Sequence, residues 1–170
     1  MDLIRKQEEQ ADMERVWKIV THPLYVQNME KNKKAEIERK FCRHDMEHFM
    51  NVARLAYIFK LERKYKVSKE EIYATAMLHD IGKWQQYLEK VPHEVASAEI
   101  AETILDETGF SEEEKERILQ AILAHRKGNG TGELAEVIYD ADKLSRDCFV
   151  CRVEAECNWS EEKKNKRILW

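Results

Sequence analysis

The segment that decides the fold lies near the middle of the chain, at residues 78–83, and reads LHDIGK. It places an imidazole and a carboxylate, His79 and Asp80, directly after the apolar helical pattern of residues 69–79. Neighbours in a regular helix point about 100° apart, so these two side chains reach one ion only near a helix end. Gly82, two residues later, supplies such an end. The segment therefore predicts a helix that stops at a pair of metal-binding side chains.

Four further helices predicted from the apolar spacing also carry a His or an Asp on the apolar face. Continued at helical spacing, their apolar stripes reach His48, His93, His125 and Asp142. A single His on such a face is more often a core residue that makes one hydrogen bond than a ligand. The recurrence favours a shared divalent cation, because each imidazole or carboxylate buried without a partner would lose its hydration. Mixed imidazole and carboxylate ligands suit Mn, Fe, Co, Ni or Zn, and the sequence does not choose among them.

Composition and helix-start signals predict an all-α fold in one domain. The 170 residues include only 5 Gly and 2 Pro, so helix breakers are rare, and a hydrophobic fraction of 43% is enough for one core. The sequences SKEE at 68–71 and SEEE at 111–114 fit the capping box that opens a helix. We expect residues 1–170 to form a single compact helical bundle, with helices at about 3–20, 24–38, 44–65, 69–79, 83–89, 93–108, 111–125, 133–147 and 161–168.

Net charge and the N-terminal sequence bear on partners and location. With 29 Lys and Arg against 33 Asp and Glu, the formal net charge is -4, so no broad basic surface predicts binding of a nucleic-acid polymer. A bound divalent cation would still let the site hold a phosphate. The chain opens with MDLIRK, which turns polar at once, and it contains no window of eighteen uninterrupted apolar residues. We therefore expect a cytoplasmic protein with no membrane partner.

The order of these residues resembles the signature of the HD superfamily of metal-dependent phosphohydrolases, which is a first His, a His-Asp pair and a later Asp. The matching stretches are HFMNVA from His48, LHDIGK around His79 and Asp80, and DADKL with Asp142. The resemblance runs from about residue 41 to residue 144. It implies an HD-type helical bundle in which these four residues hold a divalent transition metal. Residues 1–40 and the Cys-containing segment 148–170 would pack on this signature region.

Two further histidines have two possible roles, and one of these roles is to bind a second metal ion. Some members of the superfamily carry two additional His between the His-Asp pair and the last Asp, and His93 and His125 lie in that interval. The resemblance thus implies either one ion or two, with Asp80 bridging the pair in the second case. The alternative is that His93 and His125 contact the substrate or support the ligands.

The resemblance also implies how the site works. The metal would activate water for attack on phosphorus, and Asp80 would orient that water. Lys83, Arg126 and Lys127 are the candidates to bind the phosphate and to neutralise charge that develops on it, although Arg126 and Lys127 have solvated surface charge as their simpler explanation. The expected substrate is a small phosphorylated molecule, a nucleotide by preference. A homodimer is compatible with the sequence.

Three other functions compete with this one. The stretch HDMEH at 44–48 matches the H-x-x-E-H pattern of zinc metalloproteases, with Glu47 as general base. That reading leaves His79, Asp80 and Asp142 on apolar faces without a role. The HD fold also holds di-iron centres that activate oxygen, and the sequence does not exclude such an oxygenase. A nucleotide-binding module without catalysis is disfavoured because every signature ligand is present.

The four cysteines form a separate question. A site of four thiolates for Zn or an iron-sulfur cluster is one hypothesis for Cys42, Cys148, Cys151 and Cys157, and reduced core residues are the alternative. The stretch GNGTG at 128–132 lacks the Lys-Ser/Thr ending of a phosphate-binding P-loop, so we interpret it as an ordinary loop.

Overall fold

The computed structural model describes residues 13–168 and residue 170, and its regular elements in these ranges are all helical. This result confirms the all-α fold class. The first expected helix falls partly on residues 3–12, which lie outside the described residues. The α-helices are α2 (Glu14–Thr21), α3 (Pro23–Ala35), α4 (Met46–Glu62), α5 (Lys69–Leu78), α6 (Lys83–Leu88), α7 (His93–Thr108), α8 (Glu112–Ala124) and α9 (Glu133–Leu144).

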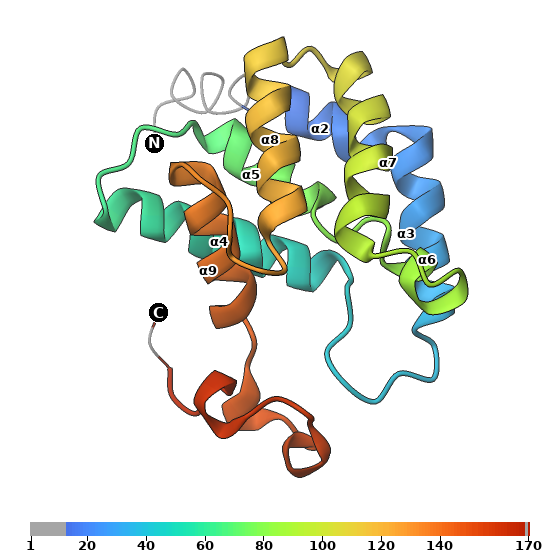
Figure 1. Ribbon diagram of the computed structural model, residues 1–170, viewed down its shortest axis with the longest axis vertical. Coiled ribbons are helices and arrows are strands. Elements are labelled where there is room, and N and C mark those ends of the chain that lie inside the picture. The colour runs from blue at the N-terminus through green and yellow to red at the C-terminus, as the bar shows by residue number, and fades with distance from the viewer. Residues whose placement is uncertain (1–12, 169) are drawn as a thin grey trace, which may run out of the picture.

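Helix α5 occupies the centre of the bundle. It packs against α2, α4, α7, α8 and α9, while α4 also packs against α9, and α7 against α6 and α8 (Figure 1). Seven of its ten residues are buried, among them Ile72, Met77 and Leu78. The His-Asp pair that follows α5 therefore lies at the end of the most enclosed helix, and both side chains are buried.

Side-chain caps explain where several helices begin. The predicted capping boxes are present at α5 and α8, where Ser68 pairs with Glu71 and Ser111 with Glu114. Helix α4 begins two residues later than predicted, because the carboxylate of Asp45 accepts the backbone N–H of residue 48 at 3.1 Å and acts as the N-cap. The residues before Asp45 are consequently outside the helix.

The prediction of a helix at 161–168 is wrong. In this range the structure has one short 3-10 turn, Glu161–Lys163, and α9 ends at Leu144 instead of residue 147. An isolated short helix is unstable without an apolar face to bury, and no residue from 161 to 168 is buried. Lys164 instead forms an ion pair of 2.7 Å with Glu154, which turns the chain back on itself.

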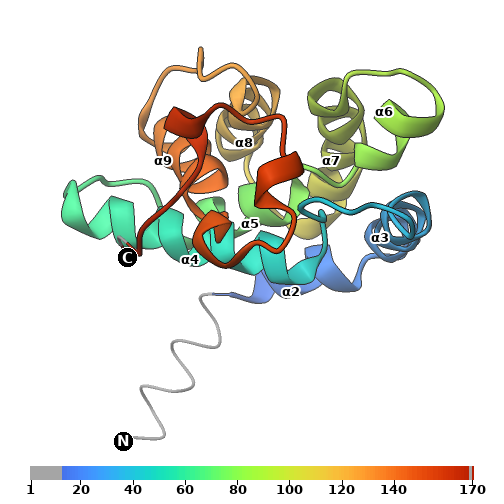
Figure 2. The ribbon, with the colours of Figure 1, turned by 90° about the horizontal axis from the view of Figure 1, so that it is seen from below.

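Residues 145–168, which we call the C-terminal segment, lie beside the loop at residues 36–45. Both views show the two stretches next to one another at one end of the bundle (Figures 1 and 2). An ion pair of 3.2 Å between Lys40 and Glu156 joins them. None of the described helices is long and apolar enough to cross a membrane.

Candidate metal centre

The turn that carries the His-Asp pair is held by a buried side chain of α3. Nδ2 of Asn32 donates to the backbone carbonyl of Asp80 at 3.0 Å, and Oδ1 of Asn32 accepts the backbone N–H of Trp84 at 2.8 Å. The indole N–H of Trp84 donates to Asn28 at 2.8 Å, and Trp84 does not line the cavity described below. An N-terminal helix thus fixes the orientation of the turn after α5.

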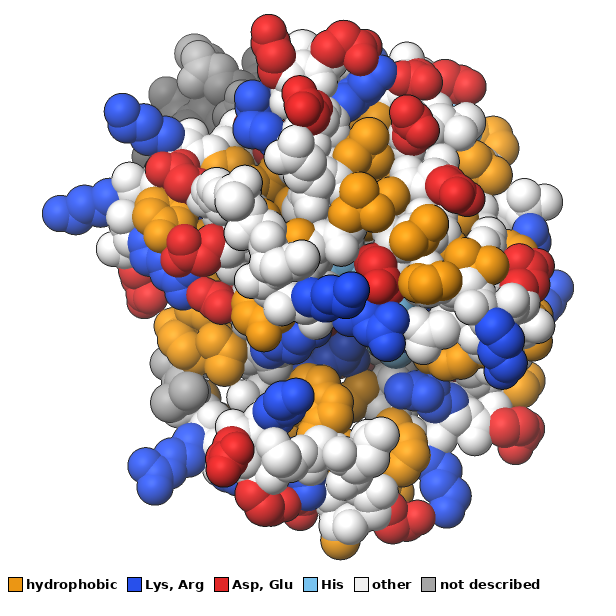
Figure 3. Space-filling view, in the orientation of Figure 1, with side chains coloured by type: hydrophobic (Ala, Val, Ile, Leu, Met, Phe, Trp, Pro, Cys, Tyr) orange, Lys and Arg blue, Asp and Glu red, His pale blue; other side chains and the backbone are white. Residues whose placement is uncertain are grey.

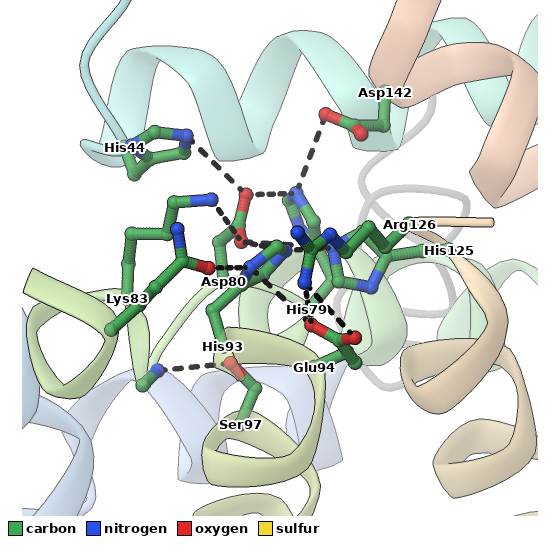
Figure 4. Close-up of polar contacts among 12 residues, drawn as sticks. His44, His79, Asp80, Lys83, His93, Glu94, Ser97, His125, Arg126 and Asp142 are labelled. Atoms are coloured by element: carbon green, nitrogen blue, oxygen red, sulfur yellow. Dashed lines mark hydrogen bonds and ion pairs between the residues drawn. The ribbon is translucent and has the colours of Figure 1, made fainter. Parts of the chain in front are cut away.

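Gly82 allows α7 to approach this turn closely. A Cβ atom at position 82 would lie 2.7 Å from the backbone carbon of Ala96 and 2.7 Å from the backbone nitrogen of Ser97. The N–H of Gly82 donates to Oγ of Ser97 at 3.0 Å (Figure 4). Glycine is needed here for space, since its φ of -93° is available to any residue. The close contact places His93, at the start of α7, beside Asp80.

The first group of ligands collects four side chains from three parts of the chain. His48 comes from α4, His79 and Asp80 follow α5, and Asp142 comes from α9; one ligand atom from each lies within 4.8 Å of the others, and all four residues are buried. Nε2 of His48 is 3.3 Å from Oδ1 of Asp142, and Nε2 of His79 is 3.2 Å from Oδ2 of Asp80. The four residues of the predicted signature therefore converge on one point.

The second group consists of Asp80, His93 and His125, which are also buried. Nε2 of His93 lies 3.4 Å from Oδ1 of Asp80, and Nε2 of His125 lies 3.6 Å from the same oxygen (Figure 4). Asp80 turns its other oxygen, Oδ2, to His79 in the first group. Its carboxylate is thus placed to bridge two ions.

Several buried atoms of the centre lack a hydrogen-bond partner. Nδ1 of His79 lies 2.7 Å from the carbonyl of Ala76, and Nδ1 of His125 lies 2.6 Å from the carbonyl of Ile122. Carbonyls only accept, so these contacts place the proton of the neutral ring on Nδ1 and turn the lone pair of Nε2 inward. Among the described residues, Nε2 of His79 and Oδ1 of Asp80 have no hydrogen-bond partner. A divalent cation would satisfy both atoms, so the residues fit a metal.

The carboxylates of the centre are held in the ionised state. Burial alone would raise the pKa of Asp80, but the positive charges of Lys83 and His79 hold it well below its usual range. At Asp142, burial is likewise outweighed, chiefly by the neighbouring imidazoles of His48 and His79, and the pKa again falls well below its usual range. Metal ligation requires this deprotonated form.

The pKa values of the imidazoles differ within the centre, and they favour a positive charge at His79. Burial disfavours the imidazolium form and lowers the pKa of His48 to about 4 and that of His93 to about 3. Burial acts on His79 too, but the two carboxylates, Asp80 and Asp142, outweigh it and raise the pKa of His79 to about 9. Where no metal binds, a proton on His79 takes the place of the cation.

Sequence reasoning missed His44 as a residue of the centre. Its ring is buried, with Nδ1 2.5 Å from Oε1 of Glu36 and Nε2 3.7 Å from Oδ2 of Asp80 (Figure 4). Glu36 is itself buried and also accepts the hydroxyl of Tyr87 at 2.7 Å. His44 precedes α4 and Glu47 is exposed, so the H-x-x-E-H pattern does not form the single helical face that a metalloprotease site needs. No sequence signal connected His44 to Glu36.

A cavity of about 670 Å³ opens beside the two ligand groups. Seven cationic side chains line it, against four acidic ones, two of which are the ligands Asp80 and Asp142. Figure 3 shows Lys and Arg side chains gathered around the hollow between the bundle and the C-terminal segment. The lining cations are Arg39, Lys40, Lys83, Arg126, Lys143, Arg146 and Lys164.

Two of the three predicted phosphate-binding residues line this cavity. Nζ of Lys83 lies 3.8 Å from Oδ1 of Asp80. Arg126 is half exposed and pairs with Glu94 at 3.4 Å (Figure 4). Lys127 is exposed and does not line the cavity.

Two cations next to Asp142 were not anticipated. Nζ of Lys143 lies 2.6 Å from Oδ2 of Asp142, and Nη2 of Arg146 lies 3.4 Å from Oδ1 of Asp142 and 3.1 Å from Nε2 of His48. They follow Asp142 by one and four residues, a spacing that keeps Arg146 on the same side of the chain. That spacing is the signal that would have found Arg146.

The loop at 128–132 does not line the cavity. Its Gly128 has φ of +67° and packs against the ring of Tyr139, so the stretch behaves as a loop. All four cysteines line the cavity wall. Neither of the metal-capable groups found among the described residues includes a cysteine.

The comparisons with known proteins agree with this architecture. The family model of the HD domain matches residues 45–147, a range that encloses all six His and Asp ligands and stops before Cys148. Over 158 residues, 93% of this chain, the sequence is 46% identical to an uncharacterized protein of Clostridium beijerinckii and covers 100% of that protein. A crystal structure of a predicted HD superfamily hydrolase from an uncultured Thermotogales bacterium is similar in fold, with a TM-score of 0.61 and 24% identity; the match covers 81% of this chain and 79% of that chain.

Fold and site together define a helical bundle with a buried His/Asp centre for metal. The chain belongs to the HD-domain family. Family membership and the two ligand groups support a metal-dependent hydrolase, with the metal ions left unspecified.

Proposed function

We propose that the protein is a metal-dependent phosphohydrolase that cleaves a phosphoester or phosphoanhydride bond of a nucleotide. The observation that carries this proposal is the cationic cavity that opens directly onto the ionised His/Asp centre. Cations around a metal centre suit a substrate with several negative charges. Seven lining cations favour a substrate with more than one phosphate group.

The chemistry divides between the centre and the cavity wall. A divalent metal held by the ligand groups would supply an activated water and polarise a phosphoryl oxygen. Asp80 is ionised and lines the cavity, so it would orient such a water as a hydrogen-bond acceptor. Lys83 stands beside Asp80, and Lys143 and Arg146 stand beside Asp142, so these three cations surround the place where negative charge develops. Arg126, further out and half exposed, would bind a distal phosphate.

His44 contributes a contact to the substrate in this proposal. Glu36 fixes its ring through Nδ1, and Nε2 points toward Asp80 and the cavity. Burial lowers its pKa, so the neutral ring prevails at neutral pH. The neutral Nε2 lone pair then accepts a hydrogen bond from a hydroxyl of the substrate or from a water beside Asp80.

The experiment is metal analysis followed by a phosphate-release screen. Nucleoside mono-, di- and triphosphates, dinucleoside polyphosphates and cyclic nucleotides are each incubated with the metal-free protein and Mn, Co, Ni or Mg in turn. We expect release from a substrate that carries more than one phosphate, lost in Asp142→Asn and retained in Lys127→Ala, whose side chain lies outside the cavity. Release that persists in Asp142→Asn, or no release with any metal, contradicts the proposal.

A di-iron oxygenase is the second candidate, favoured by one observation: Asp80 belongs to both ligand groups, as a bridge between two irons requires. The cations of the cavity have no role in that function. Oxygen uptake by the Fe(II)-loaded protein, with no phosphate release from any nucleotide, would replace the hydrolase by the oxygenase. Nucleotide binding without either activity would instead indicate a non-catalytic module.

A further inference from the structure

The C-terminal segment keeps a defined path although it has no core of its own. Within residues 145–168 the helical elements are three 3-10 turns, Cys148–Val150, Glu154–Glu156 and Glu161–Lys163. None of the apolar residues in this segment is buried; the exposed fraction is 41% at Phe149, 66% at Val150 and 75% at Ile168. Single 3-10 turns and ion pairs stabilise a chain little. A further cross-link would hold the segment in place.

Backbone hydrogen bonds of the local turns connect the positions of three cysteines in the C-terminal segment. The backbone N–H of Cys151 donates to the carbonyl of Cys148 at 3.2 Å, that of Glu154 to Cys151 at 3.3 Å, and that of Cys157 to Glu154 at 3.1 Å. Cys151 and Cys157 each end a 3-10 turn in an extended conformation, and all three cysteines line the same cavity. The local turns therefore bring Cys148, Cys151 and Cys157 to one cavity wall.

The fourth cysteine approaches from a distant part of the sequence. Cys42 belongs to the loop between α3 and α4, where Arg39 donates to its carbonyl at 2.8 Å. It lines the same cavity as the other three cysteines, and all four are free thiols. Burial raises the pKa of the Cys148 thiol.

We propose that Cys42, Cys148, Cys151 and Cys157 bind a thiophilic metal centre through four thiolates, separate from the His/Asp centre. It would tie the C-terminal segment to the loop at 36–45 and hold one wall of the cavity in place. Such a centre contributes its binding free energy to folding, which suits a segment without a core. The thiol protons are released when the metal binds.

The spacing of the thiols favours an iron-sulfur cluster over a single zinc ion. Zinc–sulfur bonds of about 2.3 Å bring tetrahedral thiolates to within about 4 Å of one another. Among the described residues, no three of these sulfurs lie within 4.8 Å of one another. The irons of a cluster occupy different corners, so the thiolates that bind them stand further apart.

The surroundings supply charge to balance four thiolates. Arg39, Lys40 and Lys164 line the same cavity wall. Nε of Arg146 is buried without a hydrogen-bond partner. Arg146 lines the same cavity as Cys42, so its guanidinium adds positive charge to this wall.

The test uses the full chain, purified without oxygen. Iron, zinc and acid-labile sulfide are measured per chain in the wild type, in Cys42→Ser and Cys151→Ser, and in Asp142→Asn as the matched variant that disrupts the His/Asp centre. We expect sulfide and visible thiolate-to-iron absorption in the wild type and in Asp142→Asn, with both lost in the two cysteine variants. Zinc without sulfide, lost only in the cysteine variants, supports the four-thiolate centre and rejects the cluster.

A measurement on the wild type covers the case in which the cysteine variants do not fold. The native chain is titrated with a mercurial that binds thiolates, and released metal is recorded against modified thiols. Metal released as the four thiols react supports the centre. The proposal is overturned if the native thiols react as freely as those of the unfolded chain and no metal leaves, or if Asp142→Asn removes all bound metal.

Discussion

The Nε2 atoms of His93 and His125 face each other at 3.1 Å. The Nδ1 atoms of these rings contact the side-chain oxygen of Gln86 and the carbonyl of Ile122, which places the proton of each neutral ring on Nδ1. Two lone pairs at this distance repel unless a cation lies between them. The same two nitrogens face Oδ1 of Asp80, so the second ligand group is arranged around a positive charge.

The first prediction concerns the number of ions. We expect His125→Ala to lower the bound metal from two ions per chain to one, because it removes a ligand of the second group only. Metal analysis after dialysis at a fixed free metal concentration measures this. Lys127→Ala serves as the control, since Lys127 lies near His125 but outside the cavity. Equal metal content in His125→Ala and the wild type would show that His125 is no ligand.

The second prediction concerns the shared carboxylate. Asp80→Asn should weaken both ions and lower phosphate release by about 100-fold or more, because one residue serves both groups. Asp140→Asn is the matched control, since Asp140 pairs with Arg63 at 2.6 Å and belongs to neither group. Activity and metal content are compared in both variants. A larger loss in Asp140→Asn than in Asp80→Asn would refute the bridging role.

The third prediction concerns the close contact at Gly82. Gly82→Ala should lower the free energy of unfolding by about 1–3 kcal/mol, because the new methyl group meets the backbone of Ala96 and Ser97. The matched variant Ser97→Ala removes one hydrogen bond without a clash and should cost about 1 kcal/mol. Urea unfolding of the metal-free proteins gives both values. The explanation fails if Gly82→Ala is as stable as the wild type.

The fourth prediction concerns pH in the metal-free protein. The folded pKa values of about 4 for His48 and about 3 for His93 lie below the ordinary value of about 6.5, so the unfolded chain takes up these protons first. Stability is therefore lost as pH falls from about 6.5 to about 4. His79, with a folded pKa of about 9, acts in the opposite direction, and its contribution is lost as pH rises from about 6.5 to about 9.

Urea unfolding with a chelator present, at pH values from 5 to 9, checks this profile. We expect a maximum near pH 6.5 and a smaller loss on the acid side in His48→Asn. His22→Asn serves as the control variant, because His22 is the N-cap of α3 and belongs to neither ligand group. Stability that rises steadily toward pH 5 would show that these rings are charged in the folded state.

The fifth prediction separates His44 from the H-x-x-E-H pattern. His44→Asn should lower phosphate release by about 10- to 100-fold and leave the bound metal unchanged, because His44 faces Asp80 and the cavity without belonging to a ligand group. Glu47→Ala should change neither quantity, since Glu47 is exposed. Loss of metal in Glu47→Ala would restore the metalloprotease reading.

The sequence alone was sufficient for features that depend on local periodicity. Ser68 and Ser111 marked helix starts that the structure shows, because a capping box is completed within four residues. Five of the six His and Asp residues of the centre, all except Asp80, stood on apolar faces for the same reason, since one helical turn relates each of them to buried neighbours. The expected helix at 161–168 failed where periodicity had no face to bury.

Only the tertiary structure decided which side chains meet. Glu36 and His44 lie in a loop whose path depends on its anchors, so no helical period connects them with Asp80. Cys42 reaches the cavity wall of Cys148 for the same reason. From the sequence we interpreted Gly82 as a helix-end signal, whereas the structure shows that the missing side chain leaves room for the backbone of α7. Hydrogen bonds within a helix are set by neighbours in sequence, but contacts between helices are set by packing around α5, which no local pattern encodes.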